Sequence, residues 1–240
     1  MPAFLNDITS FIGTGEKNEQ GLGLQEFLDE YDSKKYECPC VTADILVMRH
    51  PRDFHTVREG IKLLMIKRRN HPGIGMWALP GGFTEIRENL MDSAKRELKE
   101  ETNLEGIPME QLSTWGNYDR DPRCRIITTS FLALVEEDIQ GMKAGDDAAD
   151  AAWMDVELER EAEEIVREGD RERVRTIYSL KLNGPREVPA LTARTAYTVN
   201  RYGLLKEPHY EILEREGIAF DHPCMIVQAL LHIQRLLEGK

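Results

Sequence analysis

Apolar residues occur along this chain in short blocks with the length of strands, and polar segments rich in glycine, proline and charge separate them. Blocks dominated by β-branched and aliphatic residues predict buried strands at 41–48 and 61–66. Shorter apolar runs bounded by turn residues are typical of further strands. These are expected at 112–118, 125–135, 151–156, 174–182 and 191–199, the last two joined as a hairpin through 183–185.

Four segments have the composition or the periodicity of helices. Apolar residues recur every four positions within 89–102, which predicts one face packed against a sheet. A second helix with an apolar stripe is expected after Asp221, which has the character of an N-cap, with Pro223 in the first turn. A short amphipathic helix is expected at 24–31, and the densely charged segment 157–172 favours a helix on the surface.

The order of these elements indicates the fold class. Strands and helices alternate irregularly, with hairpins among them, which favours a mixed sheet flanked by helices over a doubly wound parallel sheet. We expect an N-terminal extension over residues 1–40, serving as a docking arm for the body or for a partner subunit. The main domain is expected over 41–240, with an insertion at about 157–215.

Composition and charge narrow the classes of partner. The chain of 240 residues is 41% hydrophobic and has a formal net charge of -12, which disfavours non-specific binding to nucleic acid. Its start lacks the features of a signal peptide, and no apolar run approaches the ~20 residues that span a bilayer. We therefore expect a cytoplasmic protein without membrane contact, and we interpret its four cysteines as free thiols.

Three carboxylates mark the helix at 89–102 as a candidate metal site. Glu97, Glu100 and Glu101 lie at i, i+3 and i+4, so their side chains converge within one helical turn and repel one another. Hard carboxylate oxygens suit Mg²⁺ or Mn²⁺ rather than Zn²⁺. The alternative is a solvated helix face, on which Lys95 and Lys99 offset part of the negative charge.

The residues around these glutamates resemble the signature of the Nudix hydrolases, G-x5-E-x7-R-E-U-x-E-E-x-G-U, where U is a bulky aliphatic residue. The matching positions are Gly82, Glu88, Arg96, Glu97, Leu98, Glu100, Glu101 and Leu104. Asn103 stands where the signature has its last glycine. That position is expected just past the helix end in a left-handed conformation, which asparagine also adopts.

The resemblance implies a mixed-sheet α/β/α sandwich that hydrolyses a nucleoside diphosphate linked to another group. It implies that Glu97, Glu100 and Glu101 hold Mg²⁺, with Mn²⁺ as an alternative, and that the backbone carbonyl of Gly81 adds a ligand. Glu100, Glu101 and Arg96 are the implied catalytic residues, with Arg96 orienting the glutamates. A carboxylate of the signature or of a loop would take the proton from water. Glu88 is expected to brace the loop.

The segments 119–123, 144–153 and 218–222 resemble the branch of ADP-ribose pyrophosphatases and Nudix-related transcriptional regulators. This implies hydrolysis of ADP-ribose to AMP and ribose 5-phosphate, and a homodimer. Arg120 and Arg123 are candidates for contact with phosphate or ribose, although Asp-Arg-Asp-Pro-Arg is also a good polar turn.

Three further side chains are weaker candidates for substrate contact. Arg68, at the end of a strand, is one of them. Trp115 and Tyr118 are candidates to stack on a base or to belong to the core. His222 is interpreted as local capping at the start of a helix.

The alternative function is a ligand-sensing regulator of NAD metabolism. Such relatives carry a winged helix-turn-helix after the Nudix-like domain, and we expect it at 191–216 if it is present. Between Arg186 and Glu216, five basic residues balance five acidic ones, without a recognition helix rich in lysine and arginine. Binding to nucleic acid is therefore not expected.

Overall fold

The computed structural model describes residues 4–58, 60–136, 148–169 and 171–239. The chain divides into two compact units, Met1–Pro39 and Cys40–Lys240. The first contains the short 3₁₀ helix η1 (Thr9–Phe11) and the helix α1 (Leu24–Glu30), and neither helix buries a residue. Among the described residues, no helix is long and apolar enough to cross a membrane.

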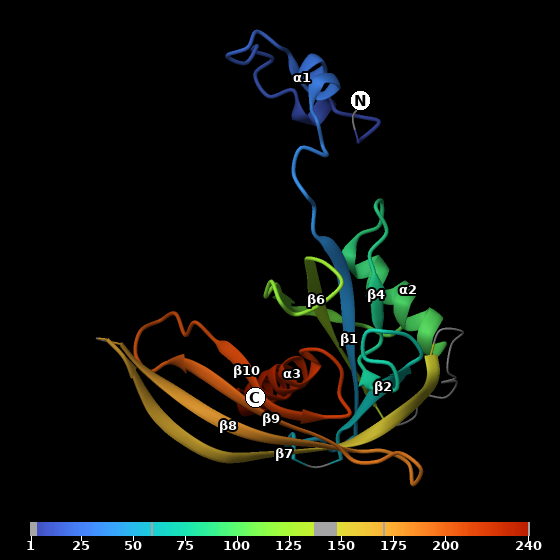
Figure 1. Ribbon diagram of the computed structural model, residues 1–240, viewed down its shortest axis with the longest axis vertical. Helices are drawn as coiled ribbons and strands as arrows, with labels where there is room; N and C mark the ends of the chain where they lie inside the picture. Colours follow the sequence, from blue (N-terminus) through green and yellow to red (C-terminus); the bar gives the residue numbers. More distant parts are fainter. Residues whose placement is uncertain (1–3, 59, 137–147, 170, 240) are drawn as a thin grey trace. The chain divides into compact units, whose positions relative to one another are not determined.

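The second unit is built on one large mixed sheet (Figure 1). Its strands are β1 (Cys40–His50), β2 (Lys62–Arg68), β3 (Trp77–Ala78), β4 (Gly81–Phe83), β5 (Glu110–Trp115), β6 (Ile126–Glu136), β7 (Ala148–Glu168), β8 (Arg171–Asn183), β9 (Leu191–Asn200) and β10 (His209–Glu216). The strand order is β10-β9-β8-β7-β2-β1-β6-β5, with β3 beside β2 and β4 beside β1. Strands β1 and β6 run parallel, and the other named pairs run antiparallel.

Helices cover both faces of the sheet at β1, which explains why every residue from 42 to 48 of that strand is buried. Successive side chains of a strand point to opposite faces. Ala43, Ile45 and Val47 pack with the helix α2 (Leu90–Thr102), whereas Leu46 and Met48 share a core with the helix α3 (His222–Glu238). The predicted mixed sheet with flanking helices is thus confirmed.

The sheet curves around α3 without closing. Strands β8, β9 and β10 all contact α3, and Figure 1 shows β7 to β10 sweeping past this helix. Although β5 and β10 stand at opposite ends of the strand order, Trp115 on β5 and Tyr210 on β10 have ring centroids 5.6 Å apart. The curvature therefore brings the two edges of the sheet together beside α3.

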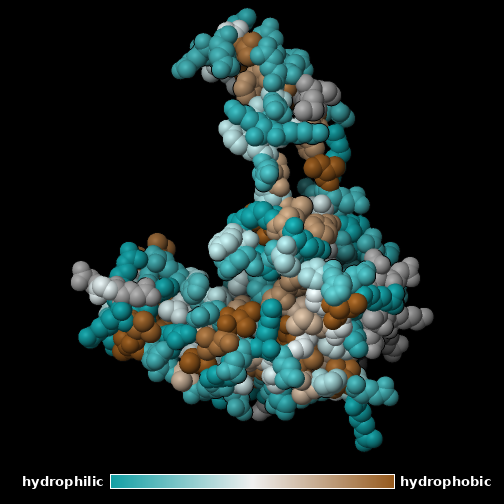
Figure 2. Space-filling view, viewed as in Figure 1, coloured by the Kyte–Doolittle hydropathy of each residue, from teal (hydrophilic) through white to brown (hydrophobic). Residues whose placement is uncertain are grey.

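The predicted surface helix at 157–172 is wrong. Strand β7 continues through most of this segment and pairs with β8 from Asp155 opposite Asn183 to the turn. Its charges form ion pairs across strands, such as Arg194–Glu161 at 2.9 Å, instead of between successive turns of a helix. Hydrophilic residues cover most of the visible face of this unit (Figure 2). Pairing with neighbouring strands decides the conformation of a charged segment whose own preference is weak.

Two other differences concern the ends of strands. Strand β5 ends at Trp115, so Tyr118 lies in the following turn and is 81% exposed. Strand β7 begins at Ala148 and is longer than the predicted 151–156. The first residues of the segment 144–153 lie outside the described residues.

Candidate active site

Two glycines allow β4 to lie against both β1 and α2. A Cβ on Gly81 would overlap the backbone carbonyl oxygen of Ala43, and a Cβ on Gly82 would lie 2.5 Å from a carboxylate oxygen of Glu97. At the other end of α2, Asn103 has φ 59 and adopts the predicted left-handed conformation. Its N–H donates to the carbonyl oxygen of Lys99 at 2.8 Å.

Arg96 ties the helix to the loop before it. Its guanidinium donates to both carboxylate oxygens of Glu88, at 3.0 and 2.9 Å. It also donates to Glu97 at 2.7 Å, to Glu100 at 3.1 Å and to the Phe83 carbonyl oxygen at 3.0 Å. The hydrogen bonds from Arg96 and then Ser93 lower the pKa of Glu88 to about 2. Glu88 is therefore ionised and held in a bracing network.

Glu97, Glu101 and Asp44 line one pocket of about 330 Å³, here called the acidic pocket. Glu101 accepts a hydrogen bond from the N–H of Gly81 at 2.7 Å, and Asp44 accepts one from the Thr128 hydroxyl at 2.6 Å. The sequence analysis missed Asp44. Its signal was a single carboxylate in the middle of a strand whose neighbouring positions are buried and mostly apolar.

The electrostatics of the acidic pocket favour a cation. Burial, together with the carboxylates of Glu97 and Asp44, raises the pKa of Glu101 to about 8, although the N–H of Gly81 opposes the shift. Burial also raises the pKa of Glu97. A divalent cation would remove the cost of packing these charges together, and hard carboxylate oxygens suit Mg²⁺ or Mn²⁺. The residues present therefore fit such an ion.

The structure brings together only part of the predicted glutamate cage. Glu100 does not line the acidic pocket, and its side chain is 58% exposed and paired with Arg96. Within the described part of the chain, no group of three His, Cys, Asp or Glu residues is already arranged to hold a metal. The roles of Glu97, Glu100, Glu101 and the Gly81 carbonyl as ligands stay predictions.

Three arginines, Arg68, Arg120 and Arg123, form the basic side of the acidic pocket. Arg68 donates to the Pro72 carbonyl oxygen at 2.8 Å, and its guanidinium lies 4.9 Å from the ring centroid of Phe220. Arg123 pairs with Asp121 at 2.9 Å. Burial, and then the charge of Arg123, lowers the pKa of Arg68. Because guanidiniums lie beside the carboxylates, the pocket can bind an anion as well as a cation.

Arg120 lines the acidic pocket and is also bound to a carboxylate, and its contact with phosphate or ribose stays a prediction. Its side chain is 6% exposed and donates two hydrogen bonds to Asp221, at 2.9 and 2.7 Å. Asp221 occupies the N-cap position of α3 but makes no side-chain capping bond, since its carboxylate binds Arg120. The pair joins the 119–123 turn to α3.

His222 is not the local cap that the sequence suggested. The ring is buried, and its Nδ1 accepts a hydrogen bond from the N–H of Leu79 at 2.9 Å. Burial lowers the pKa of His222, which keeps the ring neutral and able to accept. His222 thereby fastens α3 to the chain just before Gly81, a long-range contact without a local sequence signal.

The comparisons with known proteins agree with this geometry. Residues 48–176, more than half of the chain, match the family model described as the NUDIX domain. An ADP-ribose pyrophosphatase of Methanocaldococcus jannaschii is 36% identical over 136 residues, which cover 55% of this chain and 73% of that protein. These matches support a Nudix hydrolase.

Two further proteins are similar to this chain. The ADPR responsive transcriptional repressor NtrR of Acinetobacter baylyi is 35% identical over 113 residues, covering 46% of this chain. The chain spans only 43% of the length of that repressor. A MutT/nudix family protein from Enterococcus faecalis has a crystal structure similar to 90% of this chain and 71% of its own, with a TM-score of 0.60 and 29% identity. Fold, signature and family match together show that this chain belongs to the Nudix family.

Proposed function

We propose that this protein is a Mg²⁺-dependent hydrolase that cleaves the pyrophosphate bond of nucleoside diphosphate derivatives, with ADP-ribose as substrate and AMP and ribose 5-phosphate as products. The observation that carries the proposal is the acidic pocket, where Glu97 and Glu101 lie beside Arg68 and Arg123. A pyrophosphate needs both kinds of group, because its own charge must be neutralised before a nucleophile can approach. The similarity to an ADP-ribose pyrophosphatase supports the choice of substrate.

Each side chain has a role in this proposal. Glu97 and Glu101 would hold Mg²⁺, which when bound neutralises phosphate charge and acidifies the attacking water. Arg68 and Arg123 contact the phosphates, and Arg96 holds Glu97 in position through the 2.7 Å ion pair. A glutamate takes the proton from the water, and Glu100 and Glu101 are the two candidates.

A hydrolysis screen tests the proposal. Wild type would be incubated with Mg²⁺ and ADP-ribose, NADH, nucleotide sugars, diadenosine polyphosphates or nucleoside triphosphates, and the products separated by chromatography. Glu101→Gln should lose activity, and Glu100→Gln should lose it if Glu100 is a ligand or the base. The matched control is Glu105→Gln, since this glutamate pairs with Lys99 at the surface and should be dispensable. Equal activity in Glu101→Gln and wild type would refute the site.

A ligand-sensing regulator is the second candidate, favoured by the similarity to the NtrR repressor. Residues 191–216, where a DNA-binding module would be expected, form β9, β10 and their connection. A gel shift on promoter DNA of NAD-metabolism genes, repeated over a range of salt, tests this function. Binding that ADP-ribose releases would support the regulator. Light scattering, which gives the molar mass in solution, tests the predicted homodimer.

A further inference from the structure

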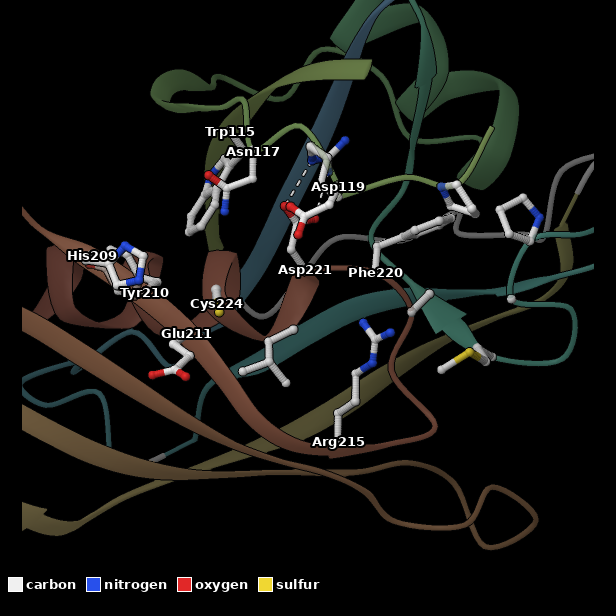
Figure 3. A pocket seen from close by; sticks show the side chains of 17 residues that line it. Trp115, Asn117, Asp119, His209, Tyr210, Glu211, Arg215, Phe220, Asp221 and Cys224 are labelled. Carbon is white, nitrogen blue, oxygen red and sulfur yellow. Dashed lines mark hydrogen bonds and ion pairs between the residues drawn. The ribbon is translucent and has the colours of Figure 1, made fainter. Parts of the chain in front are cut away.

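A second pocket adjoins the acidic pocket and has a different character. It has a volume of about 610 Å³, within the roughly 300–1,000 Å³ typical of ligand sites, and is here called the edge chamber. Figure 3 shows its walls coming from the end of β5, from β10 and from the start of α3. Arg120 and Phe220 line both pockets, so the two pockets are adjacent.

Aromatic side chains from the two edges of the sheet meet in this chamber. The rings of Trp115 and Tyr210 lie at an interplanar angle of 53°, and Tyr197 supports Tyr210 at 4.9 Å between centroids. Strand β10 and helix α3 lie outside residues 48–176, the part that matches the family model. The chamber therefore combines residues of the matched segment, such as Trp115, with residues of β10 and α3 outside it.

The charges of the edge chamber suit a neutral ligand group. Three carboxylates and two guanidiniums line it, together with Asn117 and His209. One carboxylate, that of Asp221, is already neutralised by its two hydrogen bonds from Arg120. The acidic pocket has three guanidiniums beside the glutamates that are predicted to bind the metal, so phosphate groups are better accommodated there. A planar group with hydrogen-bonding edges fits the aromatic wall and the amide of Asn117.

Phe220 stands at the boundary between the two pockets. Its backbone has φ 51, a left-handed conformation that is costly for a bulky residue. Such a conformation persists only where the surroundings hold it. The guanidinium of Arg68 over the Phe220 ring and the Arg120–Asp221 pair beside it provide that support.

We propose that the edge chamber binds the nucleobase of the substrate, against the wall formed by Trp115 and Tyr210, while the pyrophosphate lies in the acidic pocket. This inference rests on the proposed function, because it assigns the nucleoside end of the same substrate. It makes β10, outside the matched domain, a determinant of substrate choice.

The first experiment compares two probes on the wild-type protein by isothermal titration calorimetry without added metal. AMP and ribose 5-phosphate share a sugar phosphate, and only AMP carries a base. AMP should bind at least about tenfold more tightly, since stacking of a base on aromatic side chains is worth that much or more. Equal affinities would overturn the proposal, and this comparison needs no variant.

The second experiment locates the base. Tyr210→Leu retains apolar volume and removes the aromatic face, so AMP binding should weaken about tenfold while ribose 5-phosphate binding is unchanged. The matched control is Tyr202→Leu, because Tyr202 lies outside the chamber and is 66% exposed. Circular dichroism melting confirms that the variants fold. Wild-type affinity for AMP in folded Tyr210→Leu would overturn the assignment.

These measurements separate the new assignment from the proposed function, because binding is measured without turnover. Tyr210-dependent binding of AMP by a protein that hydrolyses no pyrophosphate would support the chamber and refute the enzyme. Hydrolysis of ADP-ribose with equal affinity for AMP and ribose 5-phosphate would support the enzyme and refute the chamber. If the protein is a hydrolase and the chamber binds the base, Tyr210→Leu should raise KM with little change in kcat.

Discussion

The acidic pocket and the edge chamber share Arg120 and Phe220 but are assembled in different ways. Two of the four carboxylates of the acidic pocket, those of Glu97 and Glu101, come from one turn of α2 and lie within twenty positions of Gly82 in the sequence. The chamber instead depends on the contact of Trp115 with Tyr210, 95 positions apart in the chain. A local motif thus supplies the two glutamates of the acidic pocket, whereas the curvature of the sheet forms the aromatic wall of the edge chamber.

This contrast predicts that the acidic pocket tolerates no added atom at β4. Gly82→Ala places a methyl group where the Glu97 carboxylate lies, so hydrolysis should fall by roughly 100-fold, as expected for an ångström-scale misplacement of a reacting group. Initial rates with ADP-ribose measure the effect. The control is Gly116→Ala, near the chamber, where an added Cβ meets no atom within 4 Å. A similar loss in both variants would contradict the contrast.

Arg120, which lines both pockets, should contribute more to the free energy of unfolding than a surface ion pair does. Arg120→Met leaves the carboxylate of Asp221 without its partner, and should lower the free energy of unfolding by about 3 kcal/mol. The same change at Arg52, whose side chain is 81% exposed beside Glu136, should cost less than about 1 kcal/mol. Urea denaturation compares the two variants. Equal costs would show that Arg120 does not join the pockets structurally.

The smallest expected effect is a change in the reactivity of Cys224, the cysteine that lines the edge chamber. Burial raises the pKa of Cys224 to about 12, so at pH 8 its thiol is almost entirely protonated and should react slowly with a disulfide reagent. The other three cysteines, Cys38, Cys40 and Cys124, are exposed and should react first. Mass spectrometry of the labelled peptides follows each site. AMP should slow labelling of Cys224 further, and unchanged labelling would argue against occupation of the chamber.

Two corrections show how tertiary contacts override local signals. The charged segment 157–172 has the composition of a surface helix, yet it lies in a sheet where Arg194 of β9 pairs with Glu161 of β7 and with Glu214 of β10. His222 looks like a cap from its position, yet it accepts a hydrogen bond from Leu79 across 143 positions. Neither partner can be recognised from the flanking sequence, because both contacts depend on how distant elements pack.

The sequence by itself determined the elements whose causes are local. The periodicity of α2, the glycines before it and the left-handed Asn103 at its end follow from steric rules acting over a few residues. The mixed sheet follows from the order of apolar blocks. The tertiary structure alone decided that Asp44 joins the glutamates, that Glu100 remains outside, and that β5 meets β10. These arrangements depend on sheet curvature and long-range packing, which result from many contacts between residues distant in the sequence.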